Sequence, residues 1–317
     1  MRINPKMQVS DAGDADRGPF SLEDNAAYIA WRDQKLQSAD TRASDLLVLL
    51  RANDFENPKT VLALQDRVQR SNMAFFKCPH PLGEGKDVVR KVGAALGLVT
   101  LDHNLEAEDD GITPLSVAEE GSRARYIPYT NKAMRWHTDG YYNSLDRRIN
   151  AMILYCHQAP ESGDGNRFLD HEIVYILLRE ANPDYIRALM RPDVLTIPGN
   201  CIEGDLIRPD QTGPVFSIDP DGGFLHMRYT RRARNVVWRN DPLTQEAVAY
   251  LEREILDSDS PYIISQRMAP GEGVICNNVL HDRAPFLDSE TNDDYRRLVY
   301  RARYLERIDT PDPIEGV

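Results

Sequence analysis

Two short motifs that lie far apart in the sequence constrain the fold of this chain more than any other feature. The first is the triplet His137-Thr138-Asp139, and the second is a lone histidine, His281, that follows the β-branched run 274–276. In a strand, residues i and i+2 point to the same side, so His137 and Asp139 can reach one point while Thr138 points away. His281 must reach that point from another part of the fold, so two distant segments have to meet.

The residue types in these motifs favour an iron site. Two imidazoles and one carboxylate bind one face of Fe(II) and leave three positions open for a co-substrate and dioxygen. We therefore expect His137, Asp139 and His281 to be metal ligands of an oxygenase. A His-x-Asp triplet also arises by chance, and such a histidine is then a hydrogen-bonded or surface residue. The distant histidine and the arginines described next favour the metal.

A strand rich in arginine follows His281. Segment 296–304 has β-branched and aromatic strand formers, and alternation places Arg297, Arg301 and Arg303 on one face. Because Arg296 directly precedes Arg297, only one of the two can face inward, and we favour Arg297. An inward arginine is costly unless it meets an anion. Its planar fork suits a carboxylate, so a dicarboxylate co-substrate is the natural partner.

With these motifs, the chain resembles the Fe(II)/2-oxoglutarate-dependent dioxygenases of the taurine dioxygenase, clavaminate synthase and γ-butyrobetaine hydroxylase group. The resemblance covers roughly residues 70–306, and the order and spacing of the motifs match as well. It rests on Tyr129-Thr130-Asn131 through Trp136-His137-Thr138-Asp139-Gly140, on Pro270-Gly271-Glu272 through Asn278-Val279-Leu280-His281-Asp282-Arg283, and on Arg297-Leu298-Val299-Tyr300-Arg301.

The resemblance implies a role for each residue of these motifs. His137, Asp139 and His281 would be the iron ligands, and Arg297 would pair with the distal carboxylate of 2-oxoglutarate. Arg301 sits where some relatives hold an anionic group of the prime substrate. The implied reaction consumes dioxygen, converts 2-oxoglutarate to succinate and CO2, and most often hydroxylates an unactivated C–H bond.

The implied fold is mainly β with flanking helices (α+β), built on a double-stranded β-helix or jelly roll as one structural domain. We expect the segment 125–129 before the first motif to be extended, since Pro128 breaks a helix there. The expected organisation is a disordered or loosely attached N-terminus (1–20), a helix and strand segment flanking the barrel (21–124), a jelly-roll catalytic core (125–308) and a tail (309–317).

The chain departs from the family pattern at one position. Relatives commonly carry Gly-Gly-Asp/Glu-Thr about 25 residues after the carboxylate ligand, and that threonine assists 2-oxoglutarate binding. This chain has Gly165 at the threonine position, and Asn166 could replace the missing hydroxyl. Two alternatives therefore stay open: an iron oxygenase on the same fold that does not use 2-oxoglutarate, or a catalytically silent jelly roll that binds a ligand.

The prime substrate is predicted only as a class. Arg301, Arg283 and the basic segment 228–234 suggest a small organic molecule that bears a carboxylate, sulfonate or phosphonate. Tyr141, with Tyr142 beside it, could line the substrate pocket or pack in the core. A homo-oligomer is an expectation that comes from the resemblance alone.

Composition bounds the partners and the compartment. The net charge of the 317 residues is −12, which argues against nucleic acid as a partner. We expect no secretory segment, because the first 16 residues are polar, and no membrane span, because no apolar run reaches the roughly 20 residues that one needs. No Cys-x-x-Cys pair occurs, so we expect reduced, mostly buried thiols in a cytoplasmic protein. The cysteines are Cys78, Cys156, Cys201 and Cys276.

Overall fold

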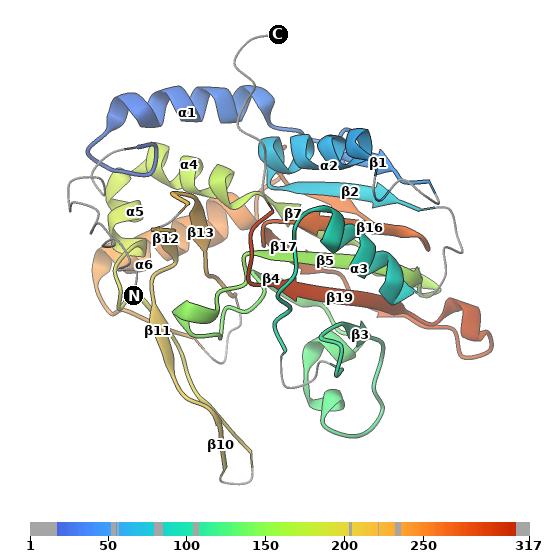
Figure 1. Ribbon diagram of the computed structural model, residues 1–317. Coiled ribbons are helices and arrows are strands. Elements are labelled where there is room, and N and C mark those ends of the chain that lie inside the picture. The colour runs from blue at the N-terminus through green and yellow to red at the C-terminus, as the bar shows by residue number, and fades with distance from the viewer. Residues whose placement is uncertain are drawn as a thin grey trace, which may run out of the picture.

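The computed structural model of the chain combines two main β-sheets with helices on the outer face of one sheet and beside both (Figure 1). It describes residues 18–51, 55, 57–78, 85–103, 108–202, 205–220, 222–231 and 236–308. The predicted tail, 309–317, and most of the predicted loose N-terminus lie outside these residues. No helix in the described part of the chain is long and apolar enough to cross a membrane.

The larger sheet joins the first and last parts of the described chain. Its strand order is β1-β2-β16-β5-β19-β3. β1 runs parallel to β2, and the other pairings are antiparallel. The strands are β1 (Leu47–Leu49), β2 (Met73–Lys77), β3 (Thr113–Leu115), β5 (Ala151–Gln158), β16 (Glu272–Cys276) and β19 (Leu298–Tyr304).

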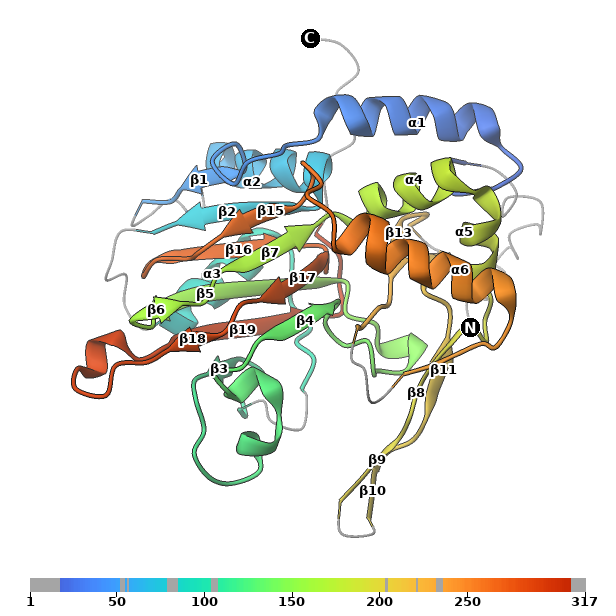
Figure 2. The same ribbon diagram turned by 180° about the vertical axis from the view of Figure 1, so that it is seen from behind.

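The smaller main sheet carries the histidine motifs. Its order is β15-β7-β17-β4, and all its pairings are antiparallel. Figure 2 shows this sheet in front of the larger one. Its strands are β4 (Met134–His137), β7 (Asn166–Leu169), β15 (Ile264–Gln266) and β17 (Leu280–Arg283).

Apolar side chains from both sheets fill the space between them. Phe75 and Leu154 of the larger sheet belong to the same buried cluster as Phe168 and Ile264 of the smaller one. The rings of Phe75 and Phe168 meet edge to face, with centroids 5.5 Å apart. Side chains alternate between the two faces of each strand, and the apolar inward-facing ones of the two sheets pack together and hold the sheets against each other.

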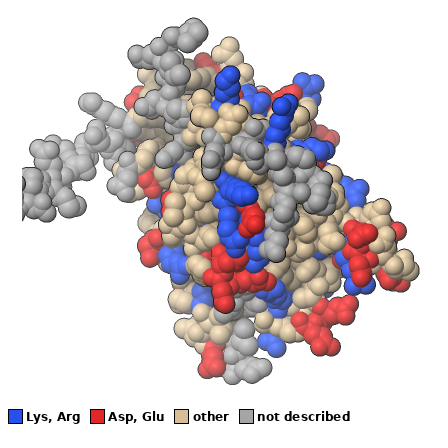
Figure 3. Space-filling model, turned by 45° about the vertical axis from the view of Figure 1, so that its right-hand side comes forward, with Lys and Arg blue, Asp and Glu red and all other residues tan. Residues whose placement is uncertain are grey.

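Helices cover the opposite face of the larger sheet. Helices α2 (Pro58–Ser71) and α3 (Gly85–Ala95) pack on Phe76, Ile153 and Tyr155. The Asn57 side chain caps α2, and Asn72 ends it in the left-handed conformation, with φ 53°. On the face shown in Figure 3, positive and negative side chains lie interspersed.

A third group of elements packs beside the sheets around its own apolar cluster. Figures 1 and 2 show the hairpin β9–β10 projecting from it, away from the sheets. Its helices are α1 (Asn25–Ser38), α4 (His171–Ala181), α5 (Pro183–Leu189) and α6 (Pro242–Tyr250), the last continuing as the π-helical turn η5 (Leu251–Leu256). Its strands are β8 (Leu195–Ile197), β9 (Asn200–Ile202), β10 (Asp205–Arg208), β11 (Gln211–Gly213), β12 (Phe216–Ile218), β13 (Leu225–Met227) and β14 (Val237–Trp238).

Several short elements complete the described chain. β6 pairs with β18 near the end of the larger sheet. The short pieces are β6 (Ser162–Gly163), β18 (Phe286–Leu287), and the 3₁₀ turns η2 (Arg123–Arg125), η3 (Ile127–Tyr129), η4 (Leu145–Arg147) and η6 (Asp293–Tyr295).

Three expectations about organisation need correction. Segment 125–129 is not extended, because it forms parts of η2 and η3, and Pro128 fits the first turn of η3. Phe20 is not loose: it is buried, and its carbonyl accepts a hydrogen bond from Tyr175. The segment 21–124 does more than flank the core, since β1, β2 and β3 belong to the larger sheet.

A buried ion-pair cluster attaches helix α1 to the rest of the fold. Lys35 is buried, with its Nζ 2.7 Å from Asp170 and 2.6 Å from Glu172. Burial alone would lower the pKa of Lys35, but these two carboxylates outweigh burial and raise it above its ordinary value. The lysine therefore stays charged, and its carboxylate partners depend on it.

Replacing Lys35 with methionine is expected to destabilise the protein by roughly 3–5 kcal/mol, because two buried carboxylates lose their nearest cation. Urea unfolding followed by circular dichroism measures this. Lys77→Met is the matched control: its pair with Glu272 is exposed, so a loss of at most about 1 kcal/mol is expected. Equal losses for the two variants would contradict the assignment of Lys35 as a buried anchor.

Candidate metal centre

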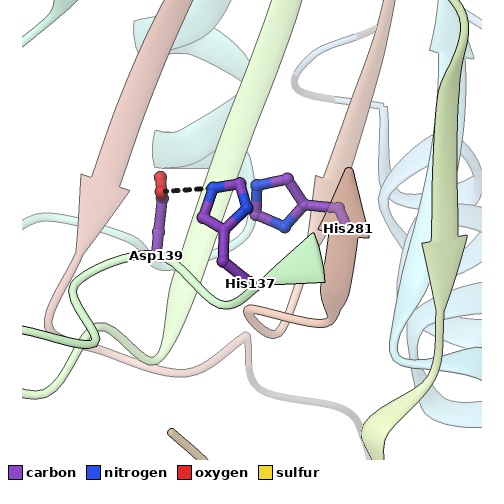
Figure 4. Close-up of side chains that lie close together, drawn as sticks. All are labelled: His137, Asp139 and His281. Carbon is purple, nitrogen blue, oxygen red and sulfur yellow. Dashed lines mark ion pairs between the residues drawn. The ribbon is translucent and has the colours of Figure 1, made fainter. Parts of the chain in front are cut away.

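The two distant histidine motifs meet in the structure. His137 ends β4, His281 lies in β17, and the two residues are direct partners across these antiparallel strands. Their ring centroids are 4.2 Å apart. Asp139 follows two residues after His137, and one ligand atom from each of the three side chains lies within 4.8 Å of the others. Figure 4 shows the three side chains converging on one region.

The backbone near each histidine fixes the orientation of its ring. Nδ1 of His137 lies 2.9 Å from the carbonyl oxygen of Arg135, and Nδ1 of His281 lies 3.0 Å from that of Val279. Each histidine can therefore donate Nδ1–H to a carbonyl two residues earlier, which makes Nε2 the metal-binding atom. Nε2 of His137 lies 3.7 Å from Oδ1 of Asp139.

The charges around the centre suit a cation. Burial alone would raise the pKa of Asp139, but Arg301, Arg303 and the two histidines outweigh burial. The pKa of this carboxyl therefore lies well below its usual range, and the carboxylate stays ionised. Burial lowers the pKa of His281, which keeps its imidazole neutral near pH 7. Oδ2 of Asp139 is buried and has no hydrogen-bond partner among the described residues. A carboxylate oxygen in that state, beside two oriented imidazoles, fits a divalent metal.

Arg297, and not Arg296, points into the protein. Arg297 is 4 % exposed, whereas the side chain of Arg296 is 57 % exposed and pairs with Asp293. Nε of Arg297 donates to both carboxylate oxygens of Asp164, at 2.7 and 2.8 Å. Its Nη1 donates to the carbonyl of Leu115 at 3.1 Å. The buried guanidinium is thus held by a carboxylate and by a backbone carbonyl.

Arg301 lies next to the carboxylate of the candidate ligand Asp139. Its Nη1 is 3.3 Å from Oδ1 of Asp139, and its buried Nε has no hydrogen-bond partner in the described structure. Tyr141 is also close, because its ring meets that of His137 edge to face at 6.4 Å. Arg301 and Tyr141 therefore both contact candidate ligands, and their roles toward a substrate stay predictions.

Arg283 and Asn166 lie near Arg297 and its partner Asp164. Nε of Arg283 is 4.0 Å from Asp164, and its Nη2 donates to the carbonyls of Thr130 and Lys132. Asn166 is the direct partner of Arg283 across β7 and β17. Its amide donates to the carbonyl of Asp282, while its buried Oδ1 has no partner among the described residues. Arg283 is thus grouped with Arg297 and not with Arg301 and Tyr141.

Sequence reasoning missed two residues of this region. Asp164 belongs to a glycine-containing segment that resembled a plain turn, yet it is buried at a left-handed φ of 60° and binds Arg297. Asn278 was only one letter of the second motif, yet it bonds to the backbone of Asp139. An acidic residue between two glycines could have pointed to Asp164, whereas no sequence pattern identifies the partner of Asn278.

Comparisons with known proteins show what this chain is similar to. A curated protein from Amycolatopsis sp, named uridine-5'-phosphate dioxygenase, is 32 % identical over 186 residues, which is 56 % of this chain. The matched region spans 62 % of that relative, so a substantial part of its length has no counterpart in the alignment.

Solved structures share the fold at low sequence identity. An asparagine oxygenase, solved with Fe(II), hydroxyasparagine and succinate, has 13 % identity and a TM-score of 0.53, covering 86 % of this chain and 91 % of its own. The non-haem iron oxygenase OrfP has 16 % identity and a TM-score of 0.55, with coverages of 80 % and 84 %. PvcB from Pseudomonas aeruginosa has 16 % identity and a TM-score of 0.55, with coverages of 82 % and 86 %.

A family comparison matches most of the chain. The match runs over residues 38–303, and so contains all three candidate ligands together with Arg297 and Arg301. The chain therefore belongs to the taurine catabolism dioxygenase TauD, TfdA family.

Proposed function

We propose that this protein is a non-haem Fe(II)- and 2-oxoglutarate-dependent oxygenase that oxidises a small, anionic organic substrate. The observation that carries the proposal is the convergence of His137, Asp139 and His281 from two separate segments. Family membership supports it, and so do two buried arginines, Arg297 directly before β19 and Arg301 within that strand. In this proposal the two facing sheets form the double-stranded β-helix of the family.

Different residues would bind the iron and the co-substrate. His137, Asp139 and His281 would hold the iron, which when bound supplies the coupling of dioxygen reduction to oxidative decarboxylation of 2-oxoglutarate. Arg297 would bind the distal carboxylate of the co-substrate with the part of its guanidinium that Asp164 and Leu115 do not occupy. Asn166 would replace the family's threonine, since its side-chain amide lies buried beside Arg283.

Arg301 and Tyr141 would bind and orient the prime substrate at the metal. Arg301 already lies against Asp139, so an anionic group bound there would place the rest of the substrate close to the centre. The relative from Amycolatopsis sp is named for uridine 5'-phosphate, which carries such an anion, so a nucleoside monophosphate is the first substrate to assay. Arg283 would act at the co-substrate end, because it lies beside the Arg297–Asp164 pair.

The absence of a hydroxyl at Gly165 favours one rival, an iron oxygenase that does not use 2-oxoglutarate. The proposal predicts that anaerobic protein given Fe(II) and then 2-oxoglutarate develops a weak visible charge-transfer band that requires both additions. Succinate should then form in air when a substrate is present. A protein that binds iron but shows neither the band nor succinate would favour this rival, and a protein that binds no iron would favour a silent binding protein.

A further inference from the structure

The turn between β16 and β17 contains an asparagine with an unusual backbone. Asn278 adopts a left-handed φ of 51°, a conformation that asparagine tolerates better than most residues. Its side chain is 3 % exposed, so every polar atom of the amide needs a partner inside the protein. It finds these partners on the backbone of two other segments.

The side-chain amide of Asn278 bonds to both the N–H and the carbonyl of the Asp139 backbone. Its Oδ1 accepts a hydrogen bond from the backbone N–H of Asp139 at 2.8 Å, and its Nδ2 donates to the carbonyl of Asp139 at 3.0 Å. Nδ2 also donates to the carbonyl of Ile149 at 2.7 Å. One side chain thus joins the exit of β4, the approach to β5 and the β16–β17 turn.

Packing on the same segment restricts its movement further. Gly140 follows Asp139 at a φ of 67°, and a Cβ there would lie only 2.3 Å from Cγ1 of Ile149. The backbone after Asp139 therefore lies directly on the residue whose carbonyl Asn278 binds. Rotation of this segment would break the hydrogen bonds of Asn278 and the packing on Ile149 together.

The same turn also supports the third metal ligand. Val279, the next residue, provides the carbonyl that lies 3.0 Å from Nδ1 of His281. Two of the three candidate ligands, Asp139 and His281, therefore depend on two consecutive residues of one turn. Ligands must be held within roughly 0.5 Å of their working positions for tight metal binding, and contacts of this kind supply that precision.

We propose that Asn278 is a positioning residue that fixes Asp139 relative to His281 before the metal binds. This inference rests on the proposed iron site. Losing such a supporting contact typically lowers metal affinity by about 10- to 100-fold. The effect should reach catalysis through metal loading, since Asn278 itself contacts the backbone of a ligand and not a reacting group.

The variant Asn278→Gly tests this assignment, because glycine keeps the left-handed backbone and removes only the amide. Titration calorimetry of the metal-free protein with Co(II) is expected to show affinity lowered by about 10- to 100-fold. Hydrogen exchange at the Asp139 amide, measured without metal, is expected to become faster.

Asn72→Gly is the matched control. Asn72 is also a buried asparagine at a left-handed φ, 53°, and its side chain bonds to Asp170 and Asn277 but not to a ligand. This variant should lose stability and keep the Co(II) affinity and Asp139 exchange of the wild type. An equal effect of the two glycine variants, or unchanged exchange in Asn278→Gly, would overturn the positioning role. Wild-type protein that binds no Co(II) would instead overturn the iron site itself, and this inference with it.

Discussion

The variant His281→Ala is expected to lose stoichiometric Fe(II) binding and all detectable succinate formation. His281 is the one ligand that the later motif supplies, and without it the remaining His137 and Asp139 form an incomplete site. The loss of metal affinity should exceed the roughly 10- to 100-fold decrease typical of removing a supporting contact. Anaerobic Fe(II) titration with the 2-oxoglutarate charge-transfer band as readout measures both the metal and the chelate.

A second buried histidine provides the control for this result. His226 lies in β13, is 8 % exposed, and does not belong to the metal-binding group. His226→Ala removes the same chemical group from the protein interior and should retain the band. A wild-type band in folded His281→Ala would mean that the metal binds elsewhere, and the proposed centre would be wrong.

Replacing Arg297 with lysine should raise the KM for 2-oxoglutarate by roughly 10- to 100-fold. Lysine keeps a positive charge beside Asp164 but cannot present two parallel donors to a carboxylate. A hydrogen bond to a charged group contributes about 1.5–3 kcal/mol, which corresponds to that range of affinity. Fe(II) affinity in the absence of co-substrate should stay unchanged, since Arg297 is not one of the candidate ligands. Steady-state succinate formation at varied 2-oxoglutarate concentrations measures the change.

The neighbouring arginine makes the comparison specific. Arg296 is exposed and pairs only with Asp293 among the described residues, so Arg296→Lys should leave the KM at its wild-type value. A larger effect at Arg296 than at Arg297, or a kcat defect with no change in KM, would contradict the assignment of Arg297 to the co-substrate.

The convergence of the three candidate ligands could be predicted because it depends on local patterns. His-x-Asp at the end of a strand and a histidine after a β-branched run are visible in the sequence, and the structure brings them together. The choice of Arg297 over Arg296 as the inward residue agrees with its burial. The prediction that segment 125–129 is extended was wrong. Pro128 excludes an α-helix interior, but it fits the start of a short 3₁₀ turn.

The contacts that hold the site could not be predicted in the same way. Asp164 and Arg297, or Asn278 and Asp139, meet only after distant strands have paired, and no local preference encodes which partner a buried amide or carboxylate will find. The contribution of β1, β2 and β3 to the larger sheet was missed for the same reason, since strand pairing is a property of the assembled fold.

The order of strands in the larger sheet also determines when the site can form during synthesis. β2, made early, pairs with β16, made late, and β5 lies between β16 and the last strand, β19. When Asp139 leaves the ribosome, two candidate ligands and unpaired strand edges are exposed, and β16, β17 and β19 are still to be made. Contacts between such distant segments slow folding. Metal capture is accordingly a late event, and the growing chain must keep its unpaired strand edges from aggregating until β16, β17 and β19 arrive.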